Sequence, residues 1–393
     1  MQQLTCVIIG GGYAGIHAVK AIQKRYKENA GSRTVRFIVI DKHDYHLRKV
    51  LLYKPTVSDE NITIPLAKLL PTEVEFLQAT VTKITPEEKV IRCLDADGNE
   101  NFISYDYLIL ALGSVVRQPE PEQGGIPLVN LEAARAIHEV WHSNLQKAVT
   151  ESDERERQRL MTIAVAGAGI SGIETSAELA HAVREVAAAK GLDLDMVNIV
   201  LINANERLFP ETPEKVAEKL ESHLAEQGVG TMHGRKVLQE KDGLLTLSSG
   251  ETMSVGLCIW TLGLLPNPVL RSLGIPLTPD GHVLVDESYR VQGAEGVYSI
   301  GDCAAIVDPI SGRVDGKTCK EAIAQADRLG KILLADVLGR PAPKHKAFMD
   351  FFCINLGPQQ ALVWTQQWGI DFTITGKLAA KIRKLTWNTA SFL

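Results

Sequence analysis

The sequence predicts an α/β protein made of two similar units of alternating strands and helices, with the second unit inserted into the first. Three observations carry this prediction. A glycine-rich turn occurs twice, each copy lies between a strand pattern and a helix pattern, and the chain is long enough for several cores. Of its 393 residues, 45% are hydrophobic, so two or three domains can each bury a core.

The first glycine-rich turn, GGGYAG at 10–15, joins a strand pattern at 5–9 to a helix pattern at 16–27. A second strand pattern follows and ends on Asp41, which lies 26 residues after Gly15. Glycines at these spacings allow a tight turn and a close backbone approach, and the helix N-terminus offers free N–H groups to a pyrophosphate. The pattern predicts a dinucleotide site with Asp41 on the ribose, and a purely structural turn is the alternative.

The second copy, GAGISG at 167–172, is preceded by a strand pattern at 162–166 and followed by a helix pattern at 173–189. The next strand runs into Asn203, where a carboxylate is common. An amide accepts fewer hydrogen bonds from a ribose than a carboxylate does, and it repels a 2′-phosphate less. The choice between NADH and NADPH therefore stays open. Arg207 either reaches a 2′-phosphate or is a surface arginine. Two Rossmann-like dinucleotide-binding domains are expected.

Composition excludes several other classes of protein. The net charge of −5 gives no reason to expect a nucleic-acid partner. No run of 18 apolar residues and no signal peptide are found, so we expect a cytoplasmic protein without a membrane-spanning helix. The six cysteines form no C-x2-C or C-x4-C pair, which argues against a redox-active dithiol and against a zinc site.

Two dinucleotide sites in one chain suggest a flavin and the nicotinamide nucleotide that reduces it. Three further motifs resemble those of flavin reductases built from two dinucleotide-binding domains: YLILALG at 107–113, IWTLG at 259–263 and GVYSIGD at 296–302. In such proteins the last motif carries the aspartate that binds the flavin ribityl chain, which is Asp302 here.

Within that superfamily the chain most resembles type II NADH dehydrogenases, the single-subunit NADH:quinone oxidoreductases. The resemblance covers most of the chain and is carried by the segments 41–53, 170–174 and 260–268. It implies that NADH or NADPH passes a hydride to FAD and that two electrons then pass to a quinone. It places the following residues at the cofactors: Gly10, Gly12, Tyr13, Ala14, Gly15, Asp41, Lys42, His46, Lys49, Val81, Ala111, Gly113 and Asp302 at FAD, and Gly167, Gly169, Ile170, Ser171, Gly172, Asn203 and Gly263 at NAD(P)H.

Three candidate catalytic residues also follow from the resemblance. Glu174 corresponds to an acid near the nicotinamide and the flavin, although an acid that only compensates the helix dipole is the alternative. The segment KEAIAQ at 320–325 departs from the family's acceptor segment and keeps only Gln325. Glu321 there either donates a proton to a quinone or marks a different acceptor.

These departures keep two other functions open, a soluble NAD(P)H-dependent reductase of a protein acceptor such as ferredoxin, and a flavin-bearing scaffold or sensor with little turnover. His46 is either a flavin neighbour or a packed histidine. Cys319 and Cys353 are read as isolated structural cysteines in preference to a sulfide:quinone-type pair.

The C-terminal segment predicts a basic amphipathic helix. From residue 372 onward there is no Asp or Glu, and Leu378, Ile382, Leu385 and Phe392 share one arc beside an arc of lysines. Such a helix binds an anionic membrane surface, here through 375–393 on the cytoplasmic face, or it docks on this chain or on a second copy in a homodimer. The expected divisions are an FAD domain at 1–118 and 287–345, a connecting helix and linker at 119–154, an NAD(P)H domain at 155–286 and a C-terminal region at 346–393.

Overall fold

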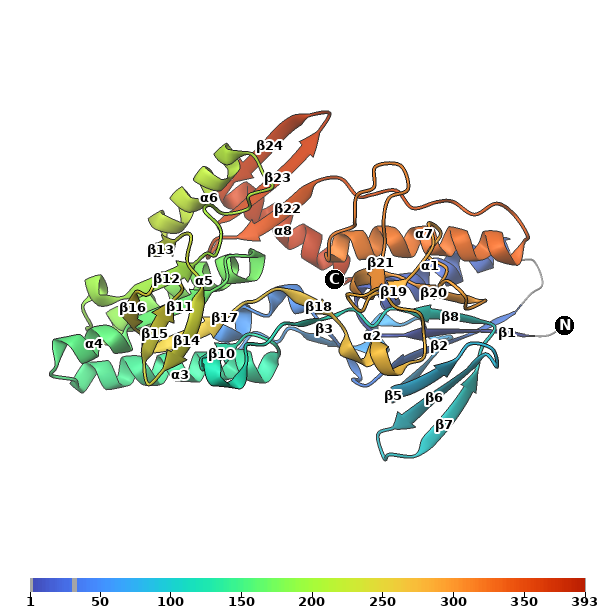
Figure 1. The fold of residues 1–393 in the computed structure, drawn as a ribbon, viewed down its shortest axis with the longest axis horizontal. Coiled ribbons are helices and arrows are strands. Elements are labelled where there is room, and N and C mark those ends of the chain that lie inside the picture. The colour runs from blue at the N-terminus through green and yellow to red at the C-terminus, as the bar shows by residue number, and fades with distance from the viewer. Residues whose placement is uncertain (1–2, 30–33, 393) are drawn as a thin grey trace.

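The computed structural model describes residues 3–29 and 34–392, and it confirms the expected α/β class with two Rossmann-like sheets. The two units lie side by side along the long axis, and the C-terminal segment packs across them (Figure 1). Among the described residues, no helix has the length and apolar composition needed to cross a bilayer.

The first sheet has seven strands in the order β20-β8-β1-β2-β5-β6-β7. The strands from β20 to β5 are parallel, whereas β6 and β7 pair antiparallel at one edge. Strand β1 is buried over its last four residues, as expected of a parallel strand covered on both faces. The bounds are β1 Leu4–Ile9, β2 Val35–Asp41, β5 Val74–Thr85, β6 Val90–Asp95, β7 Glu100–Ser104, β8 Tyr107–Leu110 and β20 Val297–Ser299.

Helices α1 (Tyr13–Asn29) and α7 (Cys319–Val337) pack against each other beside this sheet (Figure 1). A Cβ on Gly330 of α7 would lie 3.0 Å from the carbonyl oxygen of Ala21 in α1, so glycine permits the close approach. Smaller elements complete this unit: β3 Tyr45–Leu47, η1 Lys49–Leu51, η2 Lys54–Thr56, β4 Thr63–Pro65, α2 Leu66–Leu69, η5 Pro268–Ser272, β19 Val283–Leu284, η6 Gly301–Cys303 and β21 Ala304–Ala305.

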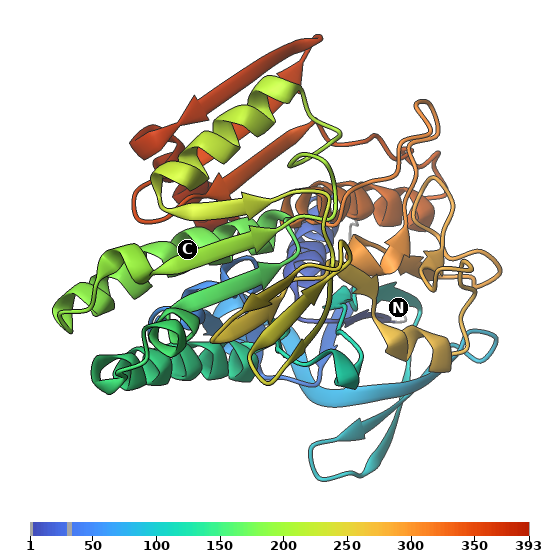
Figure 2. The ribbon, with the colours of Figure 1, turned by 60° about the vertical axis from the view of Figure 1, so that its left-hand side comes forward.

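The second sheet has five parallel strands in the order β10-β17-β11-β12-β13. Its run β17-β11-β12-β13 repeats the run β8-β1-β2-β5 of the first sheet, which is the duplication seen in the sequence. A small antiparallel sheet, β14-β15-β16, stands beside it (Figure 2). The bounds are η3 Pro121–Gln123, β10 Ile126–Pro127, α3 Leu131–Thr150, α4 Glu154–Leu160, β11 Thr162–Ala166, α5 Ile170–Ala189, η4 Leu194–Met196, β12 Asn198–Ile202, α6 Glu214–Glu226, β13 Val229–Met232, β14 Val237–Lys241, β15 Leu244–Leu247, β16 Thr252–Ser254 and β17 Leu257–Trp260.

The chain crosses between the two units in a two-stranded ribbon, where β9 (Ser114–Val116) pairs antiparallel with β18 (Leu264–Pro266). Residues after this crossing, such as Leu270 and Val283, already belong to the first core. The return to the first unit thus comes earlier than the expected residue 287, because segment 268–285 packs on β5 and β21 instead of on the second sheet. Strand β10, expected to lie in a mere connection at 119–154, also joins the second sheet as its edge strand.

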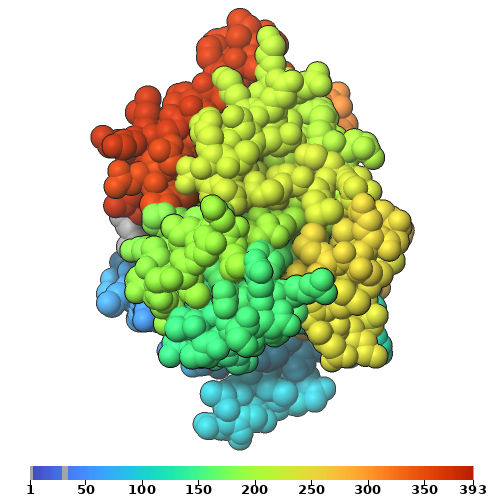
Figure 3. Space-filling model, turned by 90° about the vertical axis from the view of Figure 1, so that its left-hand side faces the viewer, coloured from blue at the N-terminus to red at the C-terminus, as the bar shows by residue number. Residues whose placement is uncertain are grey.

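The C-terminal segment forms an antiparallel sheet of β22 (Phe351–Asn355), β23 (Ala361–Gln367) and β24 (Ile370–Thr375), followed by helix α8 (Gly376–Ala390). The helix lies within the expected 375–393, and the sheet ahead of it was not anticipated. Ile354 and Leu362 are buried in the second unit's core. In Figure 3 the segment, in red, packs along one side of the second unit.

Candidate active site between the two units and the C-terminal segment

The first glycine turn leaves an open face at the N-terminus of α1. A Cβ on Gly10, whose φ is +114°, would lie 2.3 Å from the carbonyl oxygen of Ala111, and one on Gly15 would lie 1.8 Å from that of Gly10. A Cβ on Gly12 would meet no protein atom within 4 Å. The outer two glycines are therefore required by packing, whereas the middle one borders the space in which a pyrophosphate fits.

Asp41 is fixed at the end of β2 beside this turn. Its Oδ2 accepts a hydrogen bond from Gly11 N at 2.6 Å, and its Oδ1 accepts one from His43 N at 2.9 Å. Each carboxylate oxygen keeps a further lone pair that a ribose hydroxyl can use. Lys42, expected at the FAD, has an exposed side chain, and Val81 is buried in the first core.

Three residues far apart in sequence meet on the same side of the first sheet. Ser114 Oγ donates to Asp302 Oδ2 at 2.7 Å, and Lys49 Nζ donates to Ser114 O at 2.8 Å. Burial lowers the pKa of Lys49, and the charge of Asp302 partly offsets this. A half-buried carboxylate and ammonium of this kind fit a ligand with hydroxyl and anionic groups, such as the ribityl chain of a flavin.

Gln325 clamps the turn that carries Asp302. Its Oε1 accepts from Gly301 N at 2.7 Å, and its Nε2 donates to Asp315 Oδ2 at 2.8 Å. The side chain is 2% exposed, so both of its polar ends are engaged inside the protein. Gln325 thus stabilises the Gly301–Cys303 turn.

Glu321 caps helix α7. Its Oε1 accepts from Gly316 N at 2.8 Å, and its Oε2 accepts from Thr318 N at 3.2 Å and from Thr318 Oγ at 2.8 Å. One carboxylate oxygen of Glu321 thus serves the capping box with Thr318 and the other binds the backbone of Gly316, so both oxygens are engaged inside the protein. The sequence carries a signal for this cap, a threonine followed three residues later by a glutamate.

The second glycine turn repeats the geometry of the first. A Cβ on Gly167, whose φ is +116°, would lie 2.4 Å from the carbonyl oxygen of Thr261, and one on Gly172 would lie 1.8 Å from that of Gly167. A Cβ on Gly169 would again meet no protein atom within 4 Å. A groove of about 400 Å³ lies over this turn, and its lining includes Gly167, Gly169, Asn203, Phe209, Thr261 and Gly263. Ile170 and Ser171 open helix α5 next to it.

Asn203 is buried at the end of β12, with its amide already engaged. Its Oδ1 accepts from Asn205 N at 3.1 Å, and its Nδ2 lies 2.9 Å from His233 Nδ1. The other ring nitrogen of His233 lies 3.3 Å from Glu221 Oε1. With the His233 Nε2–H directed to that carboxylate, Nδ1 accepts from the amide, which leaves Asn203 one N–H to offer a ribose oxygen.

Arg207 holds the loop that follows β12. Its guanidinium donates to the carbonyl oxygens of Pro210 and Thr212 and ties the 207–212 loop together.

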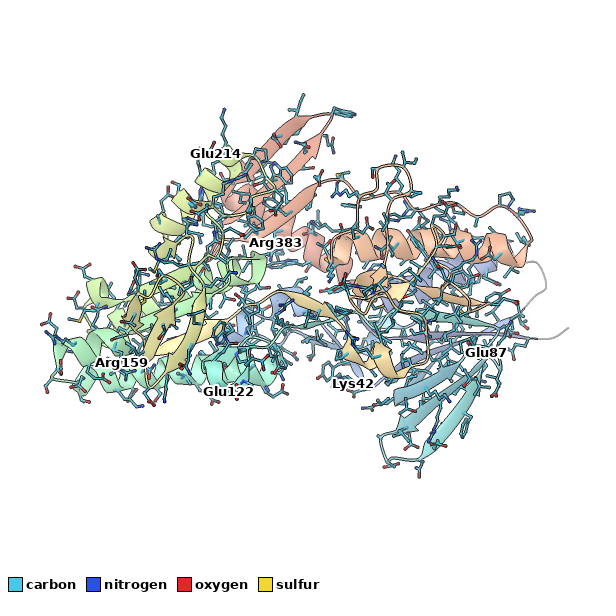
Figure 4. The ribbon with its side chains drawn as sticks, viewed as in Figure 1. Lys42, Glu87, Glu122, Arg159, Glu214 and Arg383 are labelled. Carbon is cyan, nitrogen blue, oxygen red and sulfur yellow. The ribbon has the colours of Figure 1, made fainter. Side chains whose placement is uncertain are left out.

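Glu174 points from α5 to the C-terminal segment. It is 3% exposed, forms an ion pair with Arg383 of α8, and accepts from Asn355 N of β22 at 2.9 Å. Burial raises the pKa of Glu174 to about 7, although Arg383 opposes this shift. In Figure 4 Arg383 lies where the C-terminal segment meets the end of α7. Arg383 and Asn355 were not identified from the sequence, since nothing local links them to Glu174.

Unpaired buried polar atoms are concentrated next to this ion pair. The Tyr13 ring meets the His46 ring edge-on at 4.5 Å, and the Arg383 guanidinium lies 4.1 Å from the centre of the Trp387 ring. Seven buried side-chain atoms of this region, among residues 3–29 and 34–392, form no hydrogen bond of ordinary geometry with another protein atom: Tyr13 Oη, His46 Nε2, Arg48 Nε, Tyr53 Oη, Arg383 Nε, Trp387 Nε1 and Ser391 Oγ. Among these residues, the Tyr13 side chain faces Ser391 and the Tyr53 side chain faces Arg383. Such atoms are costly unless a ligand or water pairs with them, so the region fits a polar ligand.

His46 is neutral in this setting. Burial lowers its pKa to about 4, and its Nδ1 lies 3.1 Å from the carbonyl oxygen of Gly11, so Nδ1 carries the proton. Its Nε2 is then an unpaired acceptor. His46 thus links the first glycine turn to the polar region around Glu174.

Cys319 is partly buried and Cys353 is buried, and both are free thiols. Burial raises the pKa of both thiols, that of Cys353 to about 11. Neighbouring Lys320 donates from Nζ to Phe351 O at 3.0 Å, and burial lowers its pKa to about 8.

Comparisons with known proteins extend this picture. The chain is 23% identical over 400 residues to a type II NADH:quinone oxidoreductase of Staphylococcus aureus (strain MSSA476), covering 98% of this chain and 94% of the relative. It is 24% identical over 403 residues to the protein of the same name in Staphylococcus haemolyticus (strain JCSC1435), with the same coverage. The resemblance to type II NADH dehydrogenases found in the sequence is thus confirmed over nearly the whole length.

Solved structures share the fold. NDH2 of Plasmodium falciparum in complex with NADH superimposes with a TM-score of 0.83 at 17% identity, covering 99% of this chain and 94% of that chain. The sulfide:quinone oxidoreductase of Aquifex aeolicus gives a TM-score of 0.76 at 17% identity, with 98% and 90% coverage.

A family model described as pyridine nucleotide-disulphide oxidoreductase matches residues 4–326. That range contains both glycine turns, both sheets and the turn that carries Asp302. The chain belongs to the pyridine nucleotide-disulphide oxidoreductase family and is an oxidoreductase.

Proposed function

We propose that the chain is an FAD-dependent enzyme that oxidises NAD(P)H and reduces a quinone. The observation that carries the proposal is the polar region around Glu174 and Arg383, whose unpaired buried atoms adjoin the first glycine turn. The names of the relatives from Staphylococcus point in the same direction. FAD, when bound, would supply the redox chemistry by accepting two electrons from the nicotinamide and passing them to the quinone.

The residues present fit FAD in the first unit. The open face at Gly12 and the free N–H groups of α1 suit the pyrophosphate, and Asp41 suits the adenosine ribose. Asp302 suits the hydroxyl groups of the ribityl chain, and Lys49 suits an anionic part of the flavin ring. Gln325 supports this arrangement by fixing the turn that precedes Asp302.

The groove in the second unit suits NAD(P)H, with the pyrophosphate over Gly169 and the nicotinamide towards Gly263. Asn203 brings no negative charge to the ribose. We therefore propose that the enzyme uses NADPH as well as NADH.

The role proposed for Glu174 is to hold a proton near the acceptor. Reduction of a quinone to a quinol takes up two protons along with two electrons, and this carboxyl, with a pKa of about 7, exists in both protonation states near neutral pH. Arg383 keeps the carboxyl oriented, and its unpaired Nε can donate to a quinone oxygen.

We also propose that the C-terminal segment meets an anionic membrane surface. On α8 Leu378 and Leu385 are 59% and 66% exposed beside exposed Lys377, Lys381 and Lys384. Ile370, Phe372 and Ile374 project from the edge strand β24, and Trp368 at the hairpin tip is 90% exposed. Apolar side chains among lysines are the composition that anionic bilayers bind.

The arc expected for this helix changes in two positions. Ile382 packs against the small core of the C-terminal sheet, and Phe392 stacks on His17 of α1 at 4.1 Å. Both were expected on the membrane-facing arc, but tertiary packing uses them. Removal of residues 375–393 would also remove Arg383, so membrane binding has to be tested by point substitutions.

A steady-state assay tests the proposed function. NADH and NADPH are each supplied with menadione, ubiquinone-1, ferricyanide or a ferredoxin as the acceptor. Reduction of a quinone by the purified holoenzyme is the expected result. Reduction of ferricyanide or ferredoxin without quinone reduction would favour a protein acceptor, and no reduction of any acceptor would refute an enzymatic role.

A further inference from the structure

Helix α5 presents two buried acids, one helical turn apart, to the C-terminal segment. Glu174 pairs with Arg383, whereas Glu178 pairs with Lys54, whose Nζ lies 2.7 Å from Glu178 Oε1. The Lys54 and Glu178 side chains are 22% and 6% exposed, so solvent screens this second pair weakly.

Asn355 connects the two acids through one residue. Its backbone N–H donates to Glu174 Oε1 at 2.9 Å, and its side-chain Nδ2 donates to Glu178 Oε1 at 2.7 Å. Any change that moves Glu178 therefore acts on the strand residue that also binds Glu174. The five residues of this network come from η2, α5, β22 and α8, so the network joins the first unit, the second unit and the C-terminal segment.

We propose that Lys54, Glu178 and Asn355 are positioning residues that hold Glu174 and set its readiness to take up and release a proton. The inference rests on the proposed function in one respect, since the proton is destined for the quinone. None of the three has to touch the acceptor, because each acts through Glu174.

Lys54 and Glu178, which pair with each other, have opposite effects on the pKa of Glu174. The groups that face it are Arg383 from α8, Lys54 and Tyr53 at η2, Glu178 on α5 and Cys353 on β22. Among them, Lys54 lowers the pKa of Glu174 and Glu178 raises it. Loss of the lysine charge and loss of the glutamate charge must therefore shift the titration of Glu174 in opposite directions.

The test uses the holoenzyme and two readouts. The first is the pH dependence of the infrared band of the protonated Glu174 carboxyl, identified as the band that Glu174→Gln removes. The second is the pH dependence of the rate at which menadione reoxidises the NADH-reduced enzyme. Glu178→Gln keeps the volume of the side chain, Lys54→Met removes the cation, and Glu185→Gln is the control, since Glu185 is a 75% exposed acid on the same helix.

Glu178→Gln is expected to move the midpoint of both profiles to lower pH, and Lys54→Met to move it to higher pH, each by about half a unit or more. Asn355→Asp, which places a third carboxylate between the two acids, is expected to move it to higher pH as well. Lys54→Arg keeps the positive charge and should therefore keep the wild-type midpoint. Glu185→Gln should also leave the midpoint unchanged.

Unchanged infrared midpoints, or shifts of the same sign in Glu178→Gln and Lys54→Met, would overturn the inference. If Lys54→Met does not fold, Glu178→Gln alone still tests the proposal, because a midpoint that is unchanged or higher in Glu178→Gln contradicts it. An enzyme that fails to reduce quinones would refute the proposed function, and the infrared titration would still decide the positioning role.

Discussion

Substitution of the middle glycine of the second turn separates nucleotide binding from folding. Gly169 has φ −74° and ψ −178°, a conformation open to alanine, and its Cβ would meet no protein atom within 4 Å. Gly169→Ala should therefore change the free energy of unfolding by less than about 1 kcal/mol. The same methyl group would occupy the space over the N-terminus of α5 in which the pyrophosphate of NAD(P)H is proposed to lie.

The cost to binding follows from the contacts that the methyl group displaces. Loss of two charge-assisted hydrogen bonds from backbone N–H groups, each worth about 1.5 kcal/mol, weakens binding by about 3 kcal/mol. That corresponds to an increase of about 100-fold in the NADH concentration that half-saturates flavin bleaching. The FAD content should stay at the wild-type level, because the first turn is untouched.

Gly172→Ala is the matched control for misfolding. Its Cβ would lie 1.8 Å from Gly167 O and 2.8 Å from Thr261 Oγ, so overpacking should cost about 3 kcal/mol or more. At about 2–4 °C per kcal/mol, Tm should fall by about 6–12 °C when unfolding is followed by circular dichroism. The reasoning is refuted if Gly169→Ala binds NADH within twofold of wild type, or if it loses as much stability as Gly172→Ala.

Three further substitutions test other parts of the site. Asn203→Asp should lower kcat/KM for NADPH relative to NADH by about tenfold or more, because a carboxylate repels the 2′-phosphate, and an unchanged ratio would contradict the assignment of this residue. Gln325→Leu leaves the buried N–H of Gly301 unpaired, so it should cost about 1–3 kcal/mol and reduce FAD retention, measured by Tm and by flavin absorbance after gel filtration. Leu385→Glu should weaken co-sedimentation with anionic liposomes, whereas Leu244→Glu, at a 46% exposed site on β15, should not, and equal binding of both variants would argue against a membrane-facing α8.

The pH dependence of stability supplies a separate test of Glu174. Its pKa in the folded protein, about 7, is raised above the ordinary value of 4.5, so between these values the folded state holds a proton that the unfolded state has lost. The free energy of unfolding should therefore fall as pH rises through this window. Glu174→Gln should remove this falling component from a series of denaturant titrations. An unchanged slope would show that Glu174 is already ionised at low pH.

Much of the fold could be predicted because its signals are local. The apolar runs of the parallel strands and the glycine turns lie within short stretches of sequence, and the strands β1 and β11 occur where the pattern placed them. The helices α1 and α5 begin three residues earlier than expected, at Tyr13 and Ile170, because the third glycine of each turn lies inside the first helical turn. The antiparallel C-terminal sheet was not predicted, because the basic and apolar pattern of that segment indicated only its helix.

The candidate site was only partly predictable, because its decisive contacts join distant segments. Glu174 meets Asn355 and Arg383 across 181 and 209 residues, and no periodicity or motif connects them. Arg383 lies among the lysines of a helix whose sequence is basic and amphipathic, yet its side chain is buried and pairs with Glu174. Glu321 was expected near the acceptor, and its carboxylate also caps helix α7, a contact that the local Thr-x-x-Glu pattern predicts.

The most direct test of the central claim is an anaerobic sequential stopped-flow experiment on the purified holoenzyme. The flavin is first bleached with one equivalent of NADH or NADPH and is then mixed with menadione or ubiquinone-1. Either nucleotide is expected to bleach the flavin, and the quinone should then restore the full oxidised spectrum while one quinol forms for each nucleotide consumed. A reduced flavin that quinones leave bleached, or a flavin that neither nucleotide bleaches, would contradict the central claim.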